Sequence, residues 1–362
     1  MAKRVSVDRL LFGSTALLVF SGLAMVFSAS AVLDQETHHN PYYSLLRQCV
    51  MLALGVGVMA LTVRIDYRRY KHTAVIYPVV GATALLLIAV LFFPAVNNAH
   101  RWIRFAGFSI QPSELAKPAL ILYLAWFLSQ AKEDVNQLGI LLRAVAPTLI
   151  LVALMIKEPD LGTAIVCVGV TACILFVAGL RLRYFAYAAL GSLPVLYMLI
   201  ARVGWRMGRI LAFLDPYRDP RGTGFHIIQS LIAVGTGGLT GAGYMEGKQK
   251  LFYLPEASSD FIFAVTAEEM GLIGTSVIVA LFAVFLWRGV RAAWLTEDPF
   301  GRYLATGLTM MVILQASINM SVVLGLMPTK GIPLPFLSYG GTSLFVMLGC
   351  VGVLLNITRQ LD

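Results

Sequence analysis

The chain has 362 residues, of which 58% are hydrophobic and 13% are charged, and its formal net charge is +9. A soluble domain carries about 25% charged residues, so this composition excludes an ordinary water-soluble protein and favours one that is solvated by a lipid bilayer. The basic residues are spread along the whole chain, so we expect no nucleic-acid partner.

About ten stretches of the sequence are apolar and approach the roughly 20 residues that a helix needs to cross the hydrocarbon core. Backbone groups in lipid must pair within their own segment, so the stretches predict helices. We therefore predict an all-α, polytopic integral membrane protein, in which residues 1–362 form a single transmembrane domain. The first stretch is expected to remain as a helix, because it is long for a signal peptide and no cleavage site follows it. The stretches lie near residues 10–33, 44–63, 74–96, 112–129, 140–156, 161–180, 184–203, 261–287, 303–327 and 338–357.

The positions of Lys and Arg in the short loops predict the orientation, because such residues favour the cytoplasmic side. They cluster at the amino terminus and after the second, sixth and eighth stretches, which places both termini in the cytoplasm. The first outer loop then carries Asp34 and Glu36. A long extracytoplasmic loop is expected at about 204–260, between helices 7 and 8. Within it, residues 224–235 are apolar but too short to span, which is typical of a re-entrant or interfacial piece.

The segment "QPSELAKPAL" at 111–120 begins one of the predicted helices. Pro112 suits the first helical turn, and Glu114 then lies at the positive end of the helix dipole. Lys117 is one turn further on the same face and can pair with Glu114. The pair could simply make two charges tolerable near lipid, or it could form a polar wall of a substrate cavity, because ionisable groups within membranes tend to mark function.

Two further segments place carboxylates at predicted helix starts. In "KEPDLGTA" at 157–164, Asp160 can cap the following helix, which is the simpler interpretation, or line an outer cavity. In "KLFYLPEASSDFIFAVTAEEMGLIG" at 250–274, Ser258, Ser259 and Asp260 are three candidate caps. Capping alone would be a sufficient reason for Asp260.

Glu268 and Glu269 fall two turns or more into the next apolar helix. Adjacent carboxylates at that depth need cationic or hydrogen-bonding partners, or must be protonated. We expect them to pair one helix with another.

The outer segments gather basic residues around a few carboxylates, among them Asp260. Basic groups at an outer leaflet suit a lipid-borne anionic group such as a pyrophosphate, and a carboxylate among them suits proton abstraction. Physical reasoning from the residues therefore indicates an enzyme or a carrier that acts on an anionic lipid. The basic residues are Arg101, Arg104, Arg206, Arg209, Arg218, Arg221, Lys248, Lys250 and Lys330, and the other carboxylates are Asp215, Asp219 and Glu256.

The motifs resemble those of the SEDS family (shape, elongation, division and sporulation), which includes RodA, FtsW and SpoVE. Many matches in one order are far more specific than a single short motif. The segments "MVFSASAV" and "KLFYLPE" are closer to the FtsW and SpoVE branch, which implies a role in division. The matching pieces include "QPSELAK", "EPDLGTA", "RILAFLDPYRDPRGTGFHIIQSLIAVGTGGLTGAGY" at 209–244, "LPEASSDFIFAVTAEEMGLIG" and "KGIPLPFLSYGGTS" at 330–343.

The resemblance implies a peptidoglycan glycosyltransferase that polymerises lipid II into undecaprenyl-linked glycan and releases undecaprenyl pyrophosphate. Its partners would be a class B penicillin-binding transpeptidase and other membrane proteins of the divisome or elongasome. The family's essential aspartate corresponds to Asp260, its buried polar pair to Glu114 and Lys117, and its "PDLG" aspartate to Asp160. Inversion at the sugar requires a base, for which we expect Asp260, and cations at the leaving pyrophosphate. Candidates for those cations are Arg101, Arg209, Lys248, Lys250 and Lys330.

Three alternatives stay open from the sequence. A lipid II flippase would need a polar path to both leaflets, and Glu268 and Glu269, at depth in an apolar helix, are consistent with such a path. An elongation-type RodA polymerase and a scaffold that only docks a partner are the others. No cofactor is evident and no cluster of metal ligands appears in the sequence, although Mg²⁺ or Mn²⁺ could still take part.

Overall fold

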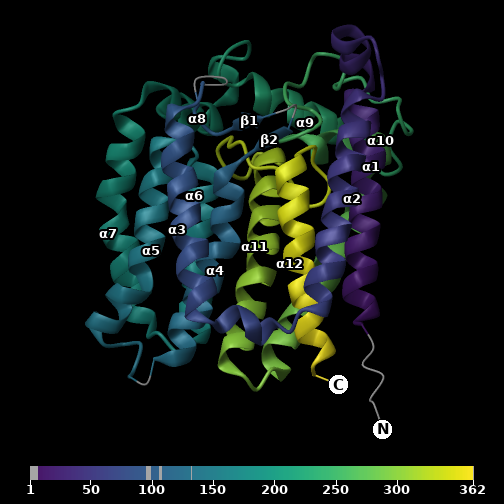
Figure 1. Cartoon of the computed structure of the whole chain (residues 1–362). Coiled ribbons are helices and arrows are strands. Elements are labelled where there is room, and N and C mark those ends of the chain that lie inside the picture. Colours follow the sequence, from purple (N-terminus) through teal and green to yellow (C-terminus); the bar gives the residue numbers. More distant parts are fainter. Residues whose placement is uncertain (1–6, 95–98, 106–107, 132, 362) are drawn as a thin grey trace.

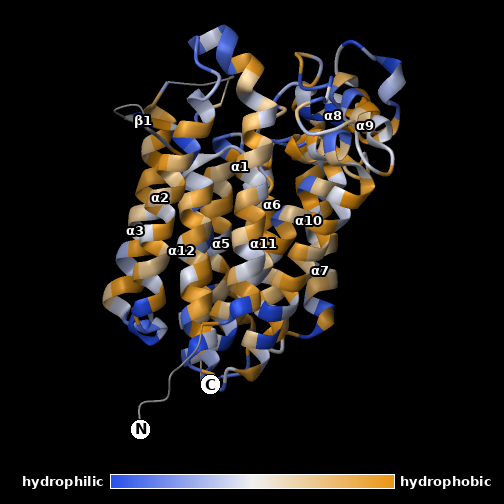
Figure 2. Ribbon diagram, turned by 90° about the vertical axis from the view of Figure 1, so that its right-hand side faces the viewer, coloured by the Kyte–Doolittle hydropathy of each residue, from blue (hydrophilic) through white to orange (hydrophobic). Residues whose placement is uncertain are grey.

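The computed structural model describes residues 7–94, 99–105, 108–131 and 133–361. Within these residues the chain forms twelve α-helices, three short 3₁₀ helices and one pair of short strands. The long helices stand side by side in a single bundle (Figure 1). Figure 2 shows that hydrophobic residues cover the middle of the bundle and that hydrophilic residues gather towards its two ends.

The helices follow the predicted stretches closely. The helices α1–α7 and α10–α12 correspond to the ten expected spans, and α8 and α9 belong to the long loop. Their bounds are α1 Arg9–His38, α2 Tyr43–Arg64, α3 Thr73–Ala89, α4 Pro112–Gln130, α5 Leu138–Lys157, α6 Leu161–Val177, α7 Leu182–Ala201, α8 Gly204–Leu214, α9 Phe225–Gly237, α10 Ile262–Leu295, α11 Pro299–Val323 and α12 Gly341–Arg359.

Eight helices in the described part of the chain are long and apolar enough to cross a bilayer, namely α1, α2, α3 with its 3₁₀ extension, α5, α7, α10, α11 and α12. The remaining two, α4 and α6, stand among them in the same bundle (Figure 1). The first turns of α4 carry Glu114 and Lys117, and α6 has only 17 residues. The prediction of an all-α polytopic membrane protein is confirmed.

The core of the bundle lies around α4, α11 and α12, each of which contributes several fully buried apolar side chains. Small residues let these helices approach closely, as is usual where lipid provides no hydrophobic drive for helix association. A β-carbon on Gly307 of α11 would lie 2.5 Å from Ile121 of α4, and one on Gly352 of α12 would lie 2.0 Å from Thr62 of α2. By contrast, α7 has no buried residue and lies at the edge of the bundle.

The first connection is shorter than expected. Because α1 runs to His38, Asp34 and Glu36 belong to the helix, so the prediction of an acidic first loop was wrong. The Asp34 carboxylate is buried and accepts hydrogen bonds from the Ser44 backbone N–H and hydroxyl, each at 2.9 Å. A buried carboxylate needs such partners, and here they join the end of α1 to the start of α2.

The segment 204–260 folds into short elements. It contains α8, a 3₁₀ turn at Pro216–Arg218, the 13-residue α9 and a series of turns. The apolar piece at 224–235 is thus a helix too short to span, as the sequence predicted. Residues 103–110 add the antiparallel strands β1 Ile103–Phe105 and β2 Phe108–Ile110, a small departure from an all-α fold.

The helix α10 is interrupted at Gly271, whose φ of 63° breaks the helical path. A break leaves backbone groups without helical partners, which is tolerated at membrane depth only where protein satisfies them. Here the N–H groups of Ala242 and Gly243 donate to the carbonyls of Glu268 and Glu269. The long loop therefore supplies hydrogen-bond partners to the backbone groups that the break in α10 leaves unpaired.

The start of α1 and the end of α12 lie at one end of the bundle, and α8, α9 and the β1–β2 pair lie at the other (Figure 1). We call the latter the upper end. The segments that the sequence marked as functional therefore meet at this end.

Candidate functional site

A cavity of about 1260 Å³ opens among the elements of the upper end. Its walls come from α2, the β1–β2 region, α8, α9, the residues before α10 and the loop that precedes α12. Basic side chains outnumber acidic ones on these walls, so the cavity suits an anionic ligand. The charged residues and the histidine that line it are Arg47, Arg101, Arg104, Arg209, His226, Glu256, Asp260 and Lys330.

Asp260 lies on the wall of this cavity with its carboxylate available. The side chain is half-buried, and its oxygens accept none of the hydrogen bonds found among the described residues. Burial raises the pKa of Asp260 to about 7, with a further increase from the negative charge of Glu256 and an opposing effect of Arg101 and Arg209. A carboxylate with a pKa near neutrality is well matched to general base catalysis.

Asp260 does not cap the helix that follows it. The N-cap position of α10 is Phe261, and no side chain makes a capping hydrogen bond there. The simpler interpretation of Asp260, as a helix cap with Ser258 and Ser259 as substitutes, is therefore wrong. The preceding backbone is instead held by the loop before α12, because the Tyr339 N–H donates to the Ser258 carbonyl at 2.9 Å.

Three of the predicted cations share the cavity with Asp260. The Arg101 guanidinium donates to the backbone carbonyls of Glu158 and Pro159, in the turn between α5 and α6. Arg209 lies over the Trp205 ring, with its guanidinium carbon 5.0 Å from the ring centroid. The Lys330 ammonium group has no hydrogen-bond or ion-pair partner among the described residues, and burial lowers its pKa.

Glu114 and Lys117 form the expected pair beneath the cavity. Both are 2% exposed, and Lys117 Nζ lies 2.9 Å from Glu114 Oε1. Lys117 also donates to Gln315 Oε1 at 2.6 Å, and Gln315 Nε2 donates to the Pro333 carbonyl at 2.9 Å. Pro333 lines the cavity, whereas Glu114 and Lys117 do not. The pair therefore supports the cavity wall from behind.

Asp160 caps α6, as the simpler interpretation predicted. Its carboxylate accepts from the Thr163 N–H at 3.2 Å, and also from Gln111 Nε2 at 3.1 Å and the Ser113 hydroxyl at 2.8 Å. Thr163 and Gln111 line the cavity while Asp160 lies behind them. Its effect on a ligand would therefore pass through these two neighbours.

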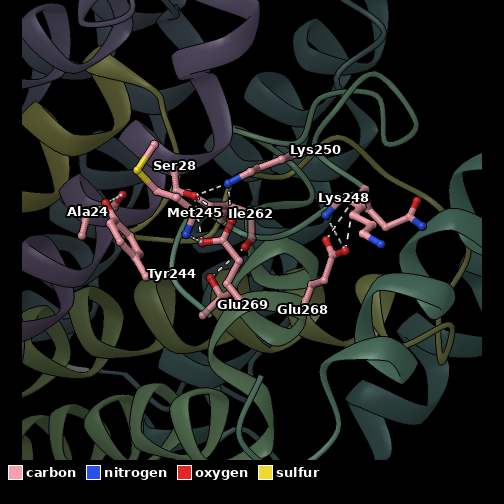
Figure 3. A network of polar contacts seen from close by, with 11 residues as sticks. Ala24, Ser28, Tyr244, Met245, Lys248, Lys250, Ile262, Glu268 and Glu269 are labelled. Carbon is pink, nitrogen blue, oxygen red and sulfur yellow. Dashed lines mark hydrogen bonds and ion pairs between the residues drawn. The ribbon is translucent and has the colours of Figure 1, made fainter. Parts of the chain in front are cut away.

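Lys248 lies apart from the cavity. Its side chain is exposed and does not line the cavity wall, and its backbone N–H donates to Glu268 Oε1 at 2.7 Å. Lys250 is buried and pairs with Glu269 Oε1 at 2.5 Å and with the Ser28 hydroxyl at 2.7 Å. Figure 3 shows Lys250 and Glu269 pointing toward one another, so the charge of Lys250 is already compensated.

Glu268 and Glu269 were expected to pair one helix with another, and this is correct for Glu269 but wrong for Glu268. Glu268 accepts backbone N–H groups from Lys248 and Gln249, and Glu269 accepts one from Met245 (Figure 3). The Ser28 hydroxyl of α1 lies 2.7 and 2.8 Å from the two oxygens of Glu269, so this carboxylate also joins α10 to α1. Both carboxylates therefore hold the 245–250 part of the loop onto α10, a partner choice that requires the folded loop.

Trp205 and His226 line the cavity but were not singled out from the sequence, whereas Glu256 was among the outer carboxylates named there. The guanidinium carbons of Arg206 and Arg209 each lie 5.0 Å from the centroid of the Trp205 ring, and the exposed Glu256 accepts a hydrogen bond from Ser259 at 2.9 Å. Burial and Arg209 lower the pKa of His226, against the opposing effect of Glu256, so this imidazole is neutral near pH 7. The aromatic residue beside two arginines was the available signal for Trp205.

Glu158 was likewise not singled out from the sequence. It is fully buried behind Arg101, and neither carboxylate oxygen has a hydrogen-bond partner among the described residues. Burial and the neighbouring Asp160 raise its pKa to about 8, while Arg101 opposes the shift. Glu158 is therefore largely protonated at pH 7. Among the described residues, no group of three or more His, Cys, Asp or Glu side chains is placed to hold a metal ion.

Comparisons with known proteins agree with these features. A family model described as "Cell cycle protein", covering FtsW, RodA and SpoVE, matches residues 8–362. A probable peptidoglycan glycosyltransferase FtsW from Geobacter metallireducens is 47% identical over 360 residues, covering 97% of this chain and 94% of that protein. Stage V sporulation protein E from Bacillus subtilis is 42% identical over 362 residues, covering 99% and 98%.

Two solved structures share the fold over nearly the whole chain. One is a chain from a peptidoglycan synthase complex that coordinates polymerization and crosslinking, with a TM-score of 0.81, 31% identity and 98% of each chain covered. The other is the rod shape determining protein RodA of Thermus thermophilus, with a TM-score of 0.73, 28% identity and coverage of 98% and 97%. The chain belongs to the FtsW, RodA and SpoVE family of cell cycle proteins.

Proposed function

We propose that this protein is a peptidoglycan glycosyltransferase that polymerises lipid II at the outer leaflet, with Asp260 as the general base. The observation that carries the proposal is the cavity at the upper end, where the Asp260 carboxylate accepts no hydrogen bond from the described residues and Arg101, Arg209 and Lys330 line the same walls. A lipid-linked sugar pyrophosphate presents the two chemistries that this arrangement fits, a hydroxyl proton that a base must remove and an anion to stabilise.

The reaction would be a single displacement that inverts the anomeric carbon. Asp260 would take the proton from the acceptor's 4-hydroxyl as that oxygen attacks the donor sugar, and the bond to the pyrophosphate would break on the opposite face. Arg101, Arg209 and Lys330 would stabilise the charge that develops on undecaprenyl pyrophosphate. Glu114, Lys117 and Asp160 would act on substrate indirectly, through the wall residues that they support. Lys248, which lies outside the cavity, would act at most on incoming substrate.

A polymerase is favoured over a flippase by the distribution of polar side chains. Below the Glu114–Lys117 pair, the centre of the bundle in the described residues is filled by apolar side chains such as Leu124, Leu308 and Phe300. A flippase would need a polar path that continues to the lower end. The positions of Lys and Arg support an extracytoplasmic cavity with both termini in the cytoplasm.

The similarity to FtsW and SpoVE proteins supports a role in cell division, and the likeness to a synthase complex supports a class B penicillin-binding transpeptidase as partner. Mg²⁺ or Mn²⁺ would bind chiefly through pyrophosphate oxygens and water, with Asp260 or Glu256 as the nearest carboxylates of the cavity. Such an ion would arrive with the substrate. Adding a chelator to the purified enzyme and measuring glycan synthesis tests whether the reaction requires such an ion.

The proposed function is tested with the purified protein in lipid nanodiscs, alone and with its transpeptidase partner. Lipid II should be converted into glycan chains, and Asp260→Ala should abolish the product while a folded protein is recovered. When the same purified protein is reconstituted into sealed vesicles, a fluorescent lipid II should not exchange leaflets faster than in protein-free vesicles. Rapid exchange without glycan formation would establish the flippase instead.

A further inference from the structure

Asn319 of α11 is buried directly behind the cavity and does not line it. Its side chain is 2% exposed, and it lies one helical turn beyond Gln315 on the same face of α11. Both amides point at the loop that precedes α12, Gln315 at the Pro333 carbonyl and Asn319 at the Ile332 carbonyl. Asn319 differs from Gln315 in having a second target.

A single nitrogen of Asn319 makes both of its contacts. Nδ2 donates to the Ile332 carbonyl at 2.7 Å and to the Asp260 carbonyl at 2.7 Å. An amide nitrogen has two hydrogens, so the two bonds use its full donor capacity. The reverse orientation would place Oδ1 against two carbonyl oxygens, so the contacts themselves determine which atom is nitrogen. The short amide of Asn319 therefore provides two diverging donors from one atom.

The two carbonyls belong to the two chain segments that carry the proposed chemistry. Asp260 supplies the base, and Ile332 follows Lys330 by two residues. The segments are in contact on the cavity side as well, because a β-carbon on Gly331 would lie 2.9 Å from Asp260 Oδ2. The Asn319 amide therefore lies behind the junction of the two segments and joins their backbones.

We infer that Asn319 is a positioning residue that holds Asp260 and the Lys330 loop in register, an inference that rests on the proposed function. Neither substrate nor the reacting atoms would touch Asn319. Its contribution would come from keeping the base and the cation at one separation, because a displacement of about 1 Å in an active site can cost about 100-fold in rate.

Asn356 provides a matched control. It is also a buried amide, 4% exposed, whose Nδ2 donates to a backbone carbonyl, that of Val63, at 2.7 Å. It lies at the lower end, on α12, where it also accepts the Tyr67 N–H at 2.9 Å. Asn356→Leu therefore removes the same kind of buried bond as Asn319→Leu, far from the cavity.

The test compares Asn319→Leu, Asn319→Ser and Asn356→Leu with the wild type in nanodiscs, by glycan synthesis per folded protein and by hydrogen exchange. For both Asn319 variants kcat should fall about 30-fold or more while KM changes less than about threefold. Exchange should rise in peptides covering 256–262 and 329–334. The Asn356 variant should keep kcat within about threefold and leave both peptides unchanged. The serine variant is included because its small side chain keeps the fold accessible if leucine does not.

A double-mutant cycle separates positioning from simple loosening. If Asn319 acts by fixing the position of Asp260 relative to Lys330, Asn319→Ser should lower kcat much less in a Lys330→Ala background than in the wild type. Equal costs in both backgrounds would overturn the inference, as would unchanged exchange in the two peptides. If the wild type makes no glycan, the proposed function is refuted. Raised hydrogen exchange in the Asn319 variants would still show that Asn319 joins the two segments.

Discussion

The carboxylate of Asp260 rests against Gly331, where a β-carbon would lie 2.9 Å from Asp260 Oδ2. The absence of a side chain at Gly331 thus leaves room for the proposed base. Gly331→Ala should displace the carboxylate and lower kcat about tenfold or more, because base geometry governs proton transfer. The end of a side chain can move, so the melting temperature should change by only a few degrees. Wild-type turnover by this variant would mean that the contact has no catalytic importance.

Asp260→Asn removes the base while preserving shape. Asparagine caps helices about as well as aspartate, and Asp260 makes no cap in the structure, so folding should be normal. Glycan synthesis should fall about 100-fold or more, since an amide cannot accept the proton. The measurement is product per folded protein, with expression and melting temperature as controls. Normal polymerisation would remove Asp260 from the mechanism.

The pH dependence of activity follows from the pKa of Asp260, about 7. The base must be ionised, so kcat/KM should rise with pH and level off above about 7. Arg101 lowers the pKa of Asp260, so Arg101→Gln should move this limb to higher pH as well as reducing the rate. A limb at the same pH in wild type and variant would contradict the electrostatic link between Arg101 and Asp260.

The pH dependence of stability has the opposite sign. Asp260 and Glu158 have folded pKa values of about 7 and about 8, above the values of 3.8 and 4.5 for unperturbed groups. Between pH 5 and 8 the folded state therefore binds more protons than the unfolded state, and stability falls as pH rises. Glu158→Gln should flatten this dependence in thermal unfolding. An unchanged slope would show that Glu158 is ionised in the folded protein.

The buried pair of Glu114 and Lys117 should behave as one unit. Removing one charge leaves the other uncompensated, which costs about 3 kcal/mol or more for a buried pair. Lys117→Ala should therefore destabilise the protein more than Glu114→Gln combined with Lys117→Met. Thermal unfolding in nanodiscs gives the comparison, with Gln315 retained in every variant. If the double variant is no more stable than the single one, charge coupling is not what the pair contributes.

The orientation can be tested by labelling engineered cysteines from outside the cell. Because Lys and Arg cluster in the loops of the lower end, sites within 210–250 should react with an impermeant reagent and sites within 64–72 should not. Detergent-solubilised cells, in which both sets react, provide the control for accessibility. The reverse pattern would place the cavity in the cytoplasm.

Local properties of the sequence were enough to determine the helices. Each span is set by an apolar stretch and by the need for backbone pairing in lipid, and neither depends on distant residues. The pairing of Glu114 with Lys117 and the capping by Asp160 were likewise predictable, since these partners lie within a few residues. The breaks at Gly271 and after His38 were not, because the groups that stabilise them come from other segments.

The composition of the site was decided by tertiary structure. The sequence offered Lys248, Lys250 and Lys330 as equivalent outer cations, and the fold exposes the first, pairs the second with Glu269 and leaves the third in the cavity. Whether Asp260 capped a helix or faced a cavity depended on where α10 begins and on what packs behind it. The contacts of Asn319 with Asp260 and Ile332 join positions 59 and 13 residues away in the chain. Contacts of that kind follow from helix packing, which no local pattern encodes.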